Sequence, residues 1–194
     1  MRGAKNYKRE ELLDQAIELF RRQGYSGTST AELVETLGVN RKSMYAEFGS
    51  KQGVFEAALD RYSEINLSRV LSPIEADDAD ADSIRRAFQG YASAIDGPFN
   101  GLGCLMANTA VERAALDPGS AQFVDAYLER LKGGFRRALE NAKAAGDVRN
   151  DANLDDLAAF FAMSIVGVSA LIRAKAPSEQ VHAACRAVTA TLDA

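Results

Sequence analysis

The chain has 194 residues, enough for one large domain or two small ones, and 47% of them are hydrophobic, which suffices for a sizeable core. A charged fraction of 26% argues against a disordered chain. The net charge is -4, but it is unevenly distributed: residues 1–62 carry a net charge of +1 and residues 63–194 carry -5. A nucleic-acid face is therefore allowed only at the N-terminal end, where Arg2, Lys5, Lys8 and Arg9 precede the first acidic residue.

Cysteine usage and the apolar runs indicate a cytoplasmic protein. Cys104 and Cys185 are too few for a disulfide framework or a cysteine metal site, and the first residues lack the apolar stretch of a signal peptide. The longest uncharged run, residues 158–172, would span roughly 22 Å as a helix, which is short of the ~30 Å core of a bilayer. We expect a buried helix there, no membrane partner, no metal and no cofactor.

Hydrophobic residues recur at helical spacing along the whole chain, and no long segment alternates with period two. This pattern predicts an all-α fold of about nine helices. Pro73 and the acidic stretch of residues 75–82 indicate one clear linker, and Asp117 with Pro118 is expected to close a helix. The expected helices are residues 8–23, 30–37, 41–48, 51–70, 83–95, 103–116, 120–145, 154–175 and 178–192.

The second and third of these helices have the layout of a helix-turn-helix. Ser29 and Glu32 fit a capping box at the start of the second helix, and Gly38 ends it. Met44 and Phe48, four residues apart, are expected to face the first two helices. The outer side of the third helix is then left to five residues, Arg41, Lys42, Ser43, Tyr45 and Ala46.

An outward helix of this composition suits the major groove of DNA. Arg41 and Lys42 can donate to O6 and N7 of guanine. Tyr45 and Lys51 are placed for phosphates, as is Thr30 at the positive end of the second helix. A basic arm at the N-terminus would add contacts to the DNA backbone or minor groove through Arg2, Lys5 and Lys8.

The same stretch resembles the DNA-binding domain of the TetR (tetracycline-repressor) family of bacterial regulators. The resemblance covers roughly residues 8–62, and it implies that Thr30, Arg41, Lys42, Ser43, Tyr45 and Lys51 match DNA-contacting positions. The sequence departs from the family at Ala46 and Glu47, so Glu47 either accepts from cytosine N4 or faces solvent. The residues that carry the resemblance are Phe20 to Gly24, Thr28-Ser29-Thr30, Leu37-Gly38-Val39, Tyr45 with Phe48, Ser50-Lys51 and Phe55.

Residues 51–194 are expected to form a second, helical domain for effector binding and dimerisation, joined to the helix-turn-helix domain of residues 1–50 by the helix 51–70. The helix 154–175 is apolar nearly all round and must be covered on more than one side. Together with helix 178–192 from each of two chains it would form a four-helix interface, and the resemblance implies the same homodimer. The alternative is a monomer in which helix 154–175 is simply central.

The resemblance also implies a ligand cavity in the second domain. Each candidate for this cavity has an alternative role as plain core, and Asn108 and Tyr127 are favoured because a pocket needs a few placed polar groups. Cys104, at the start of a helix, is either a sensor of electrophiles or a small buried thiol; the single histidine, His182, is expected at the surface. The candidate lining residues are Phe88, Tyr91, Cys104, Asn108, Phe123, Tyr127, Phe160 and Met163.

The sequence thus predicts a ligand-responsive transcriptional regulator, by default a repressor, which binds a palindromic DNA operator as a homodimer and is released by an unknown small-molecule effector. Two other classes compete with it. An enzyme is disfavoured because the chain has no HExxH motif and no Gly-rich phosphate loop, and a single histidine leaves few candidates for acid-base chemistry. A helical interaction protein that has lost DNA binding is the other, and the salt dependence of DNA affinity separates it from a regulator.

Overall fold

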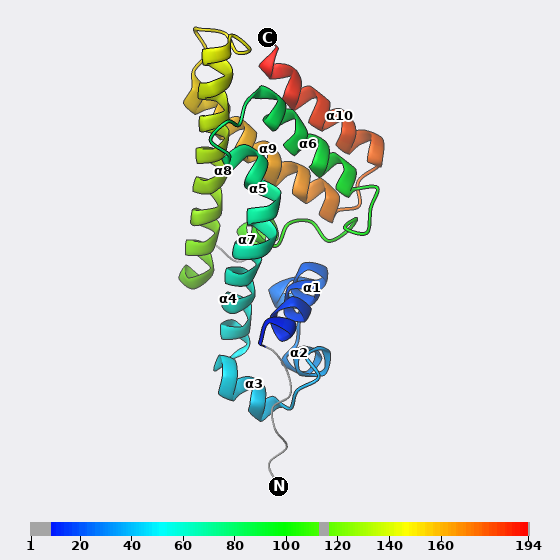
Figure 1. Ribbon diagram of the computed structural model, residues 1–194. Coiled ribbons are helices and arrows are strands. Elements are labelled where there is room, and N and C mark those ends of the chain that lie inside the picture. The colour runs from blue at the N-terminus through cyan, green and yellow to red at the C-terminus, as the bar shows by residue number, and fades with distance from the viewer. Residues whose placement is uncertain (1–8, 113–116, 194) are drawn as a thin grey trace.

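A computed structural model describes residues 9–112 and 117–193, and the regular structure within these ranges is helical (Figure 1). The segments α4, η1 and α5 run on as one continuous helix, so the described residues form nine helices, as the sequence predicts. The elements are α1 (Arg9–Gly27), α2 (Thr30–Thr36), α3 (Arg41–Phe48), α4 (Lys51–Arg61), the π-helical η1 (Tyr62–Leu67), α5 (Ser68–Glu75), α6 (Ala81–Ala94), α7 (Leu105–Glu112), α8 (Pro118–Ala145), α9 (Leu154–Arg173), α10 (Ser178–Thr189) and the 3-10 turn η2 (Ala190–Leu192).

The helices α1 and α3 pack against α4 at one end of the molecule, where α2 packs on α1, and α10 lies at the opposite end (Figure 1). The core at the first end includes an edge-to-face pair of Phe20 and Phe55, whose ring centroids are 4.9 Å apart. Gly24 has a φ of 76°, which ends the regular part of α1 at the predicted residue before a short turn leads to Gly27. Arg61 of α4 donates two hydrogen bonds to Asp14 of α1, at 2.7 and 2.9 Å.

The predicted linker is wrong at Pro73, because the long helix continues to Glu75 with Pro73 inside its last turn. The rest of the predicted linker does separate two helices, since residues 76–80 lie between α5 and α6. Proline has no N–H to donate to the carbonyl four residues earlier, which is that of Arg69. The Ser72 hydroxyl donates to this carbonyl instead, at 3.1 Å. A local side-chain donor therefore lets the helix pass a proline that sequence rules treat as a stop.

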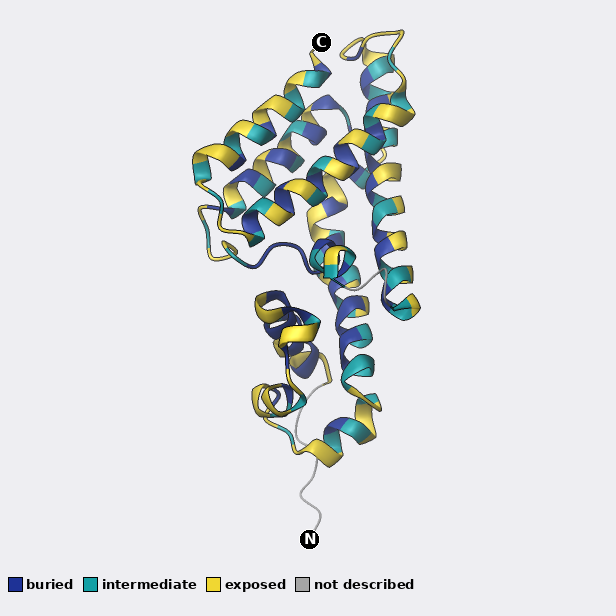
Figure 2. Ribbon diagram, turned by 180° about the vertical axis from the view of Figure 1, so that it is seen from behind, coloured by how far each residue is buried: buried dark blue, intermediate teal, exposed yellow. Residues whose placement is uncertain are grey.

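The second unit is a bundle of α5, α6, α8, α9 and α10, with their inward sides buried (Figure 2). Three aromatic rings meet at its centre, with centroid separations of 5.5 to 5.9 Å: Phe88, Phe135 and Phe161. Asp117 and Pro118, expected to close the preceding helix, begin α8 instead. Asp117 accepts a hydrogen bond from the backbone N–H of Ser120 at 2.9 Å, and proline suits a first turn because no N–H is needed there.

Among the described residues, α9 is the one helix long and apolar enough to cross a membrane. Core helices of folded domains meet the same criterion. One side of α9 is buried against α6 and α8, with Phe161 and Ile165 almost inaccessible. The other side carries Phe160 and Met163, which are 40% and 72% exposed. The expected burial of this helix is therefore met on one side only within a single chain.

Candidate functional site

Local capping bonds hold α2 and α3 in place. In the predicted capping box, Ser29 Oγ accepts from the Glu32 N–H at 3.1 Å while the Glu32 carboxylate accepts from the Ser29 N–H at 2.9 Å. Gly38, with a φ of 63°, turns the chain, and Asn40 then caps α3 by accepting from the N–H of Ser43 at 2.8 Å. The direction of α3 is thus fixed by bonds that span only a few residues.

One side of α3 faces the core and the other faces solvent, as predicted. Met44 is 1% exposed and Phe48 is half-buried, so both anchor the helix from within. Arg41 and Lys42 are exposed at the free N-terminal end of the helix, with Ala46 exposed one turn further on. Helix α3 therefore presents two cationic side chains at the tip of the molecule.

Three of the predicted DNA-contacting residues lie together. Arg41 donates to the Tyr45 hydroxyl at 3.3 Å and lies over its ring, 5.4 Å from the centroid. The hydrogen bond from Arg41 lowers the pKa of the exposed Tyr45 phenol, and a hydrogen bond with Thr30 acts in the same direction. Thr30 opens α2, so α2 and α3 offer one shared polar surface.

The remaining predicted residues border this surface. Lys51 begins α4, and its ammonium lies 4.1 Å from the ring centroid of Tyr25. Ser43 is half-buried in the first turn of α3. Glu47 pairs with Arg9 at 3.6 Å, so its carboxylate is engaged within the protein. The basic-arm residues Arg2, Lys5 and Lys8 lie outside the described residues.

The angle between α3 and α4 depends on Gly53. A Cβ placed on Gly53 would lie 1.9 Å from the backbone oxygen of Phe48, much closer than real Cβ atoms approach. Because the neighbour is backbone, it cannot swing aside as a side chain would. Glycine at this position therefore allows α4 to start close against the end of α3, and this sets where α3 points.

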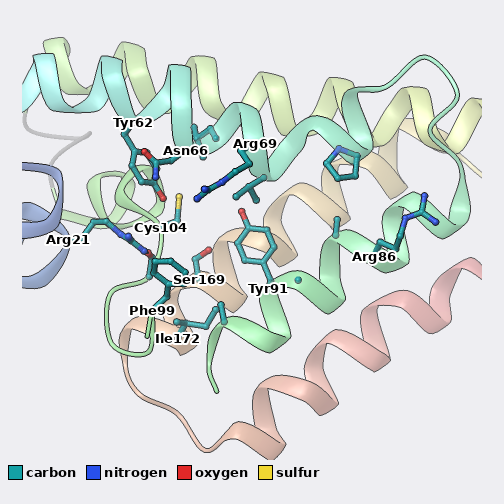
Figure 3. A pocket seen from close by; sticks show the side chains of 17 residues that line it. Arg21, Tyr62, Asn66, Arg69, Arg86, Tyr91, Phe99, Cys104, Ser169 and Ile172 are labelled. Carbon is teal, nitrogen blue, oxygen red and sulfur yellow. The ribbon is translucent and has the colours of Figure 1, made fainter. Parts of the chain in front are cut away.

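A cavity of about 320 Å³ lies between η1, α5, α6, α9 and the loop before α7 (Figure 3). Two of the predicted lining residues, Tyr91 and Cys104, do line it. Tyr127 lies next to it, with its hydroxyl 3.9 Å from the Cys104 sulfur. Both cysteines are buried free thiols in the structure.

Five other predicted lining residues do not line this cavity. Phe88 belongs to the central aromatic cluster, and Asn108 donates to the Leu102 carbonyl at 2.9 Å, which fixes the loop before α7. Phe160 and Met163 point outward from α9, because the apolar run that suggested an enclosed helix has an exposed side. The five are Phe88, Asn108, Phe123, Phe160 and Met163.

Sequence reasoning missed the three arginines of this cavity, Arg21, Arg69 and Arg86. Arg21 of α1 is only 6% exposed and donates to the Gly103 carbonyl from Nε at 3.2 Å and from a terminal nitrogen at 2.8 Å. Its position four residues after Ile17, on the apolar side of α1, was the available signal. Arg69 of α5 points between Cys104 and Tyr91 (Figure 3). No local pattern distinguished Arg69 from an ordinary surface arginine.

The hydroxyls near the cavity are held neutral. Burial raises the pKa of Tyr62 and of Tyr127 well above the ordinary range. Burial also raises the pKa of Tyr91, although its hydrogen bond with Tyr127 acts in the opposite direction. A neutral phenol can donate a hydrogen bond, so the cavity offers donors at neutral pH.

Helix α7 is tied to α1 at both of its ends. Before its first residue, the Gly103 carbonyl accepts from Arg21; at its last residue, the Glu112 carboxylate accepts from the N–H groups of Tyr25 and Ser26 at 3.0 and 2.7 Å. Gly103 and Cys104 line the cavity, so α7 connects the cavity wall to α1, the helix that packs on α2.

Comparison with known proteins identifies the family. Residues 12–58 match the family of bacterial regulatory proteins named for TetR, and residues 81–188 match the tetracyclin repressor-like C-terminal domain. The chain belongs to the TetR family. It is therefore a DNA-binding transcriptional regulator and not an enzyme.

Named relatives in the TetR family extend over nearly the whole chain. The transcriptional repressor ComR of Escherichia coli is 31% identical over 185 residues, which cover 91% of this chain and 85% of ComR. YezE of Bacillus subtilis, an uncharacterized regulator, is 28% identical over 172 residues, or 88% and 89% of the two chains.

Solved TetR-family structures share the fold. The regulator CifR, as a cysteine mutant in complex with 26-bp operator DNA, superposes with a TM-score of 0.84 at 23% identity and covers 96% of this chain and 98% of its own. A regulator from Chloroflexus aurantiacus gives a TM-score of 0.82 at 24% identity, with 93% and 91% covered. The predicted helix-turn-helix domain followed by a helical C-terminal domain is thereby confirmed.

Proposed function

We propose that the chain is a homodimeric repressor that binds a palindromic operator through α3 and is released when a small molecule enters the cavity. The observation that carries this proposal is the exposed cationic start of α3, held outward by the buried Met44. An N-terminal domain of residues 1–50 would read the DNA, and residues 51–194 would bind the effector and the second subunit. The protein would act in the cytoplasm, where its DNA lies.

The polar surface around α3 suggests a division of labour in DNA binding. Arg41 and Lys42 would reach base edges in the major groove, where guanidinium and ammonium groups donate to guanine. Thr30, Ser43, Tyr45 and Lys51 would hold phosphates on either side. The operator DNA in the CifR complex and the repressor name of ComR support an operator-binding role for this surface.

The exposed side of α9 supports a dimer through α9 and α10. Large apolar side chains that remain exposed in one chain indicate an interface, and Phe160 and Met163 are followed on the same side by the small residues Gly167 and Ala170. Small residues allow close approach of helices from a second subunit. A four-helix interface of this kind would hold the two α3 helices about 34–36 Å apart, the spacing of successive major grooves.

The two ends of α7 provide a route from the effector to the DNA. A ligand that displaces Gly103 or Cys104 would pull on Arg21, and a shift of α7 would pull on Tyr25 and Ser26 through Glu112. Either movement would turn α1 and the helices packed on it. Effector and operator affinities would then be coupled reciprocally.

Selection of bound sequences from a random DNA pool tests the proposal. We expect a palindrome, whose affinity for the protein falls steeply between low and moderate salt because several phosphates are held. If the selection enriches a sequence without two-fold symmetry, or no sequence at all, the proposal that a homodimer binds its operator through α3 is wrong.

The dimer is tested by Met163→Glu, which places a charge on the exposed side of α9. We expect sedimentation to show monomers and operator affinity to collapse, because two half-sites are no longer held together. Ala126→Glu adds the same charge at an exposed position of α8 and should leave both measurements unchanged. If Met163→Glu still forms dimers that bind the operator with normal affinity, the dimer interface does not include the exposed side of α9.

A further inference from the structure

One arginine in the cavity differs from the others. Within residues 9–112 and 117–193, Arg69 is the one arginine whose guanidinium has no hydrogen-bond or ion-pair partner. Arg69 comes from α5 and is exposed to solvent, and its guanidinium points between Cys104 and Tyr91 into the open cavity (Figure 3). A cation placed at an apolar wall without a counter-ion is poised to pair with an anion from outside.

The other two arginines of the cavity are already engaged. Arg21 donates to the Gly103 carbonyl and pairs with Glu18 at 3.3 Å. Arg86 lies at the far rim, where its nitrogens turn away from Tyr91 (Figure 3), and it donates to Ser83 at 2.8 Å and approaches Asp80 at 3.9 Å. Arg69 is thus the charge left for a ligand.

The rest of the wall is apolar or neutral. No acidic side chain is among the described residues that line the cavity. Tyr62 and Tyr91 are neutral phenols able to donate a hydrogen bond, and Asn66 adds an amide. The apolar part of the lining comprises Leu67, Val70, Pro73, Ala87, Ala94, Phe99 and Ile172.

We propose that the effector of this cavity is a small organic anion, a carboxylate on an apolar body, whose charge pairs with Arg69. The planar guanidinium fork matches a carboxylate with two parallel hydrogen bonds. The volume of about 320 Å³ is near the lower end of ligand pockets, so one ring system or a short acyl chain fits better than a large drug-like molecule. A cation would meet like charges without an acid to pair with.

Direct binding to the full-length protein without DNA tests this inference. The probes are 2-naphthoate, the neutral 2-naphthamide of nearly the same shape, and the cation 2-naphthylmethylammonium. Calorimetry should show that 2-naphthoate binds about ten- to a hundredfold more tightly than the amide, the range for a hydrogen bond to a charged group. The cation should bind no better than the amide.

Two matched variants locate the charge. Arg69→Gln keeps a polar side chain and should abolish the preference for naphthoate over naphthamide, while Arg69→Lys should retain part of it. Arg86→Gln removes a paired arginine of the same cavity and should leave the preference intact. Circular dichroism and operator binding without effector should stay unchanged in Arg69→Gln, because Arg69 has no partner to lose.

The outcomes separate this inference from the proposed function on which it rests. Equal binding of naphthoate and naphthamide, no binding of naphthoate to the folded protein, or a preference that survives in Arg69→Gln would overturn the anionic effector. If naphthoate binds through Arg69 but does not change operator affinity, the anion site stands and the effector role of the cavity fails.

Discussion

The DNA-binding end and the cavity are built from residues at very different separations in the sequence. At the DNA-binding end, the bonds that cap α2 and join the polar residues of α3 are local: Ser29 meets Glu32, and Arg41 meets Tyr45. The cavity instead joins residues from separate elements, such as Tyr62, Tyr91 and Ile172, and it includes Arg21 from α1. One site is therefore positioned by capping and turn chemistry, and the other by the packing of the whole chain.

This difference suggests how the two sites respond to change. Local bonds keep α3 in its orientation relative to α4 while the rest of the bundle adjusts. The cavity wall has no such independence, since Gly103 is bonded to Arg21 and packs close to Ser169 and Asn108. We therefore expect a ligand that moves this wall to move α1 as well, as the proposed coupling requires.

The largest effect should come from Gly53→Ala, which we expect to disturb the DNA-binding end while leaving the cavity unchanged. The added methyl group has no space beside the Phe48 carbonyl, so α3 must shift away from α4 at a cost of about 1–3 kcal/mol. We expect operator affinity to fall by about a hundredfold, since each base that a half-site no longer reads weakens binding by about 1–3 kcal/mol. Fluorescence anisotropy measures the affinity.

Gly133→Ala is the control for this change. Nothing lies within 4 Å of a Cβ at Gly133, and alanine there should stabilise α8 by about 0.5–1 kcal/mol with normal operator affinity. Binding of 2-naphthoate should survive in both variants. A Gly53→Ala protein with full operator affinity would show that the angle between α3 and α4 is not set by this contact.

The second largest effect should come from Arg21→Met, which cuts the connection between the two ends. The buried Gly103 carbonyl loses its donor, at a cost of about 1–3 kcal/mol in the free energy of unfolding. We expect the ratio of operator affinities without and with 2-naphthoate to move toward one. Arg22→Met, on the exposed side of the same helix, should change stability by less than about 0.5 kcal/mol. An unchanged ratio in Arg21→Met would assign the coupling to another contact.

The same contrast explains what the sequence predicted. Caps and turns depend on residue types three or four positions apart in the sequence. The start of α2, the outward Arg41 and the buried Met44 could therefore be predicted. The continuous helix past Pro73 could not, because it depends on a hydroxyl donor at Ser72. The cavity was only partly predictable: hydrophobicity alone does not tell an inward Tyr91 from an outward Met163.

A third effect distinguishes phosphate contacts from base contacts within the DNA-binding end. The double variant Tyr45→Phe with Lys51→Ala should weaken operator and unrelated DNA alike, because phosphates are the same in every sequence. The slope of log affinity against log salt should fall by about 1 for the missing lysine. Lys42→Ala should instead weaken the operator more than unrelated DNA. Unchanged binding of the double variant to both DNAs would refute the phosphate roles of Tyr45 and Lys51.

The smallest effect should come from Glu32→Gln, which tests whether the charge of the capping residue Glu32 contributes to stability at the DNA-binding end. Hydrogen bonds from the backbone and then the side chain of Ser29 lower the pKa of Glu32 below its usual 4.5. A carboxylate with a lowered pKa in the folded state stabilises the protein above the unfolded pKa, and this contribution is lost as the pH falls through the folded value. Glutamine keeps the acceptor but not the charge, so we expect a slightly lower Tm than wild type at about pH 7 and a difference that shrinks as the pH falls below the usual pKa of 4.5. Glu35→Gln, on the same helix and outside the capping box, should show no such convergence in thermal unfolding. Parallel behaviour of the two variants would mean that the Glu32 charge contributes nothing beyond its hydrogen bond to the start of α2.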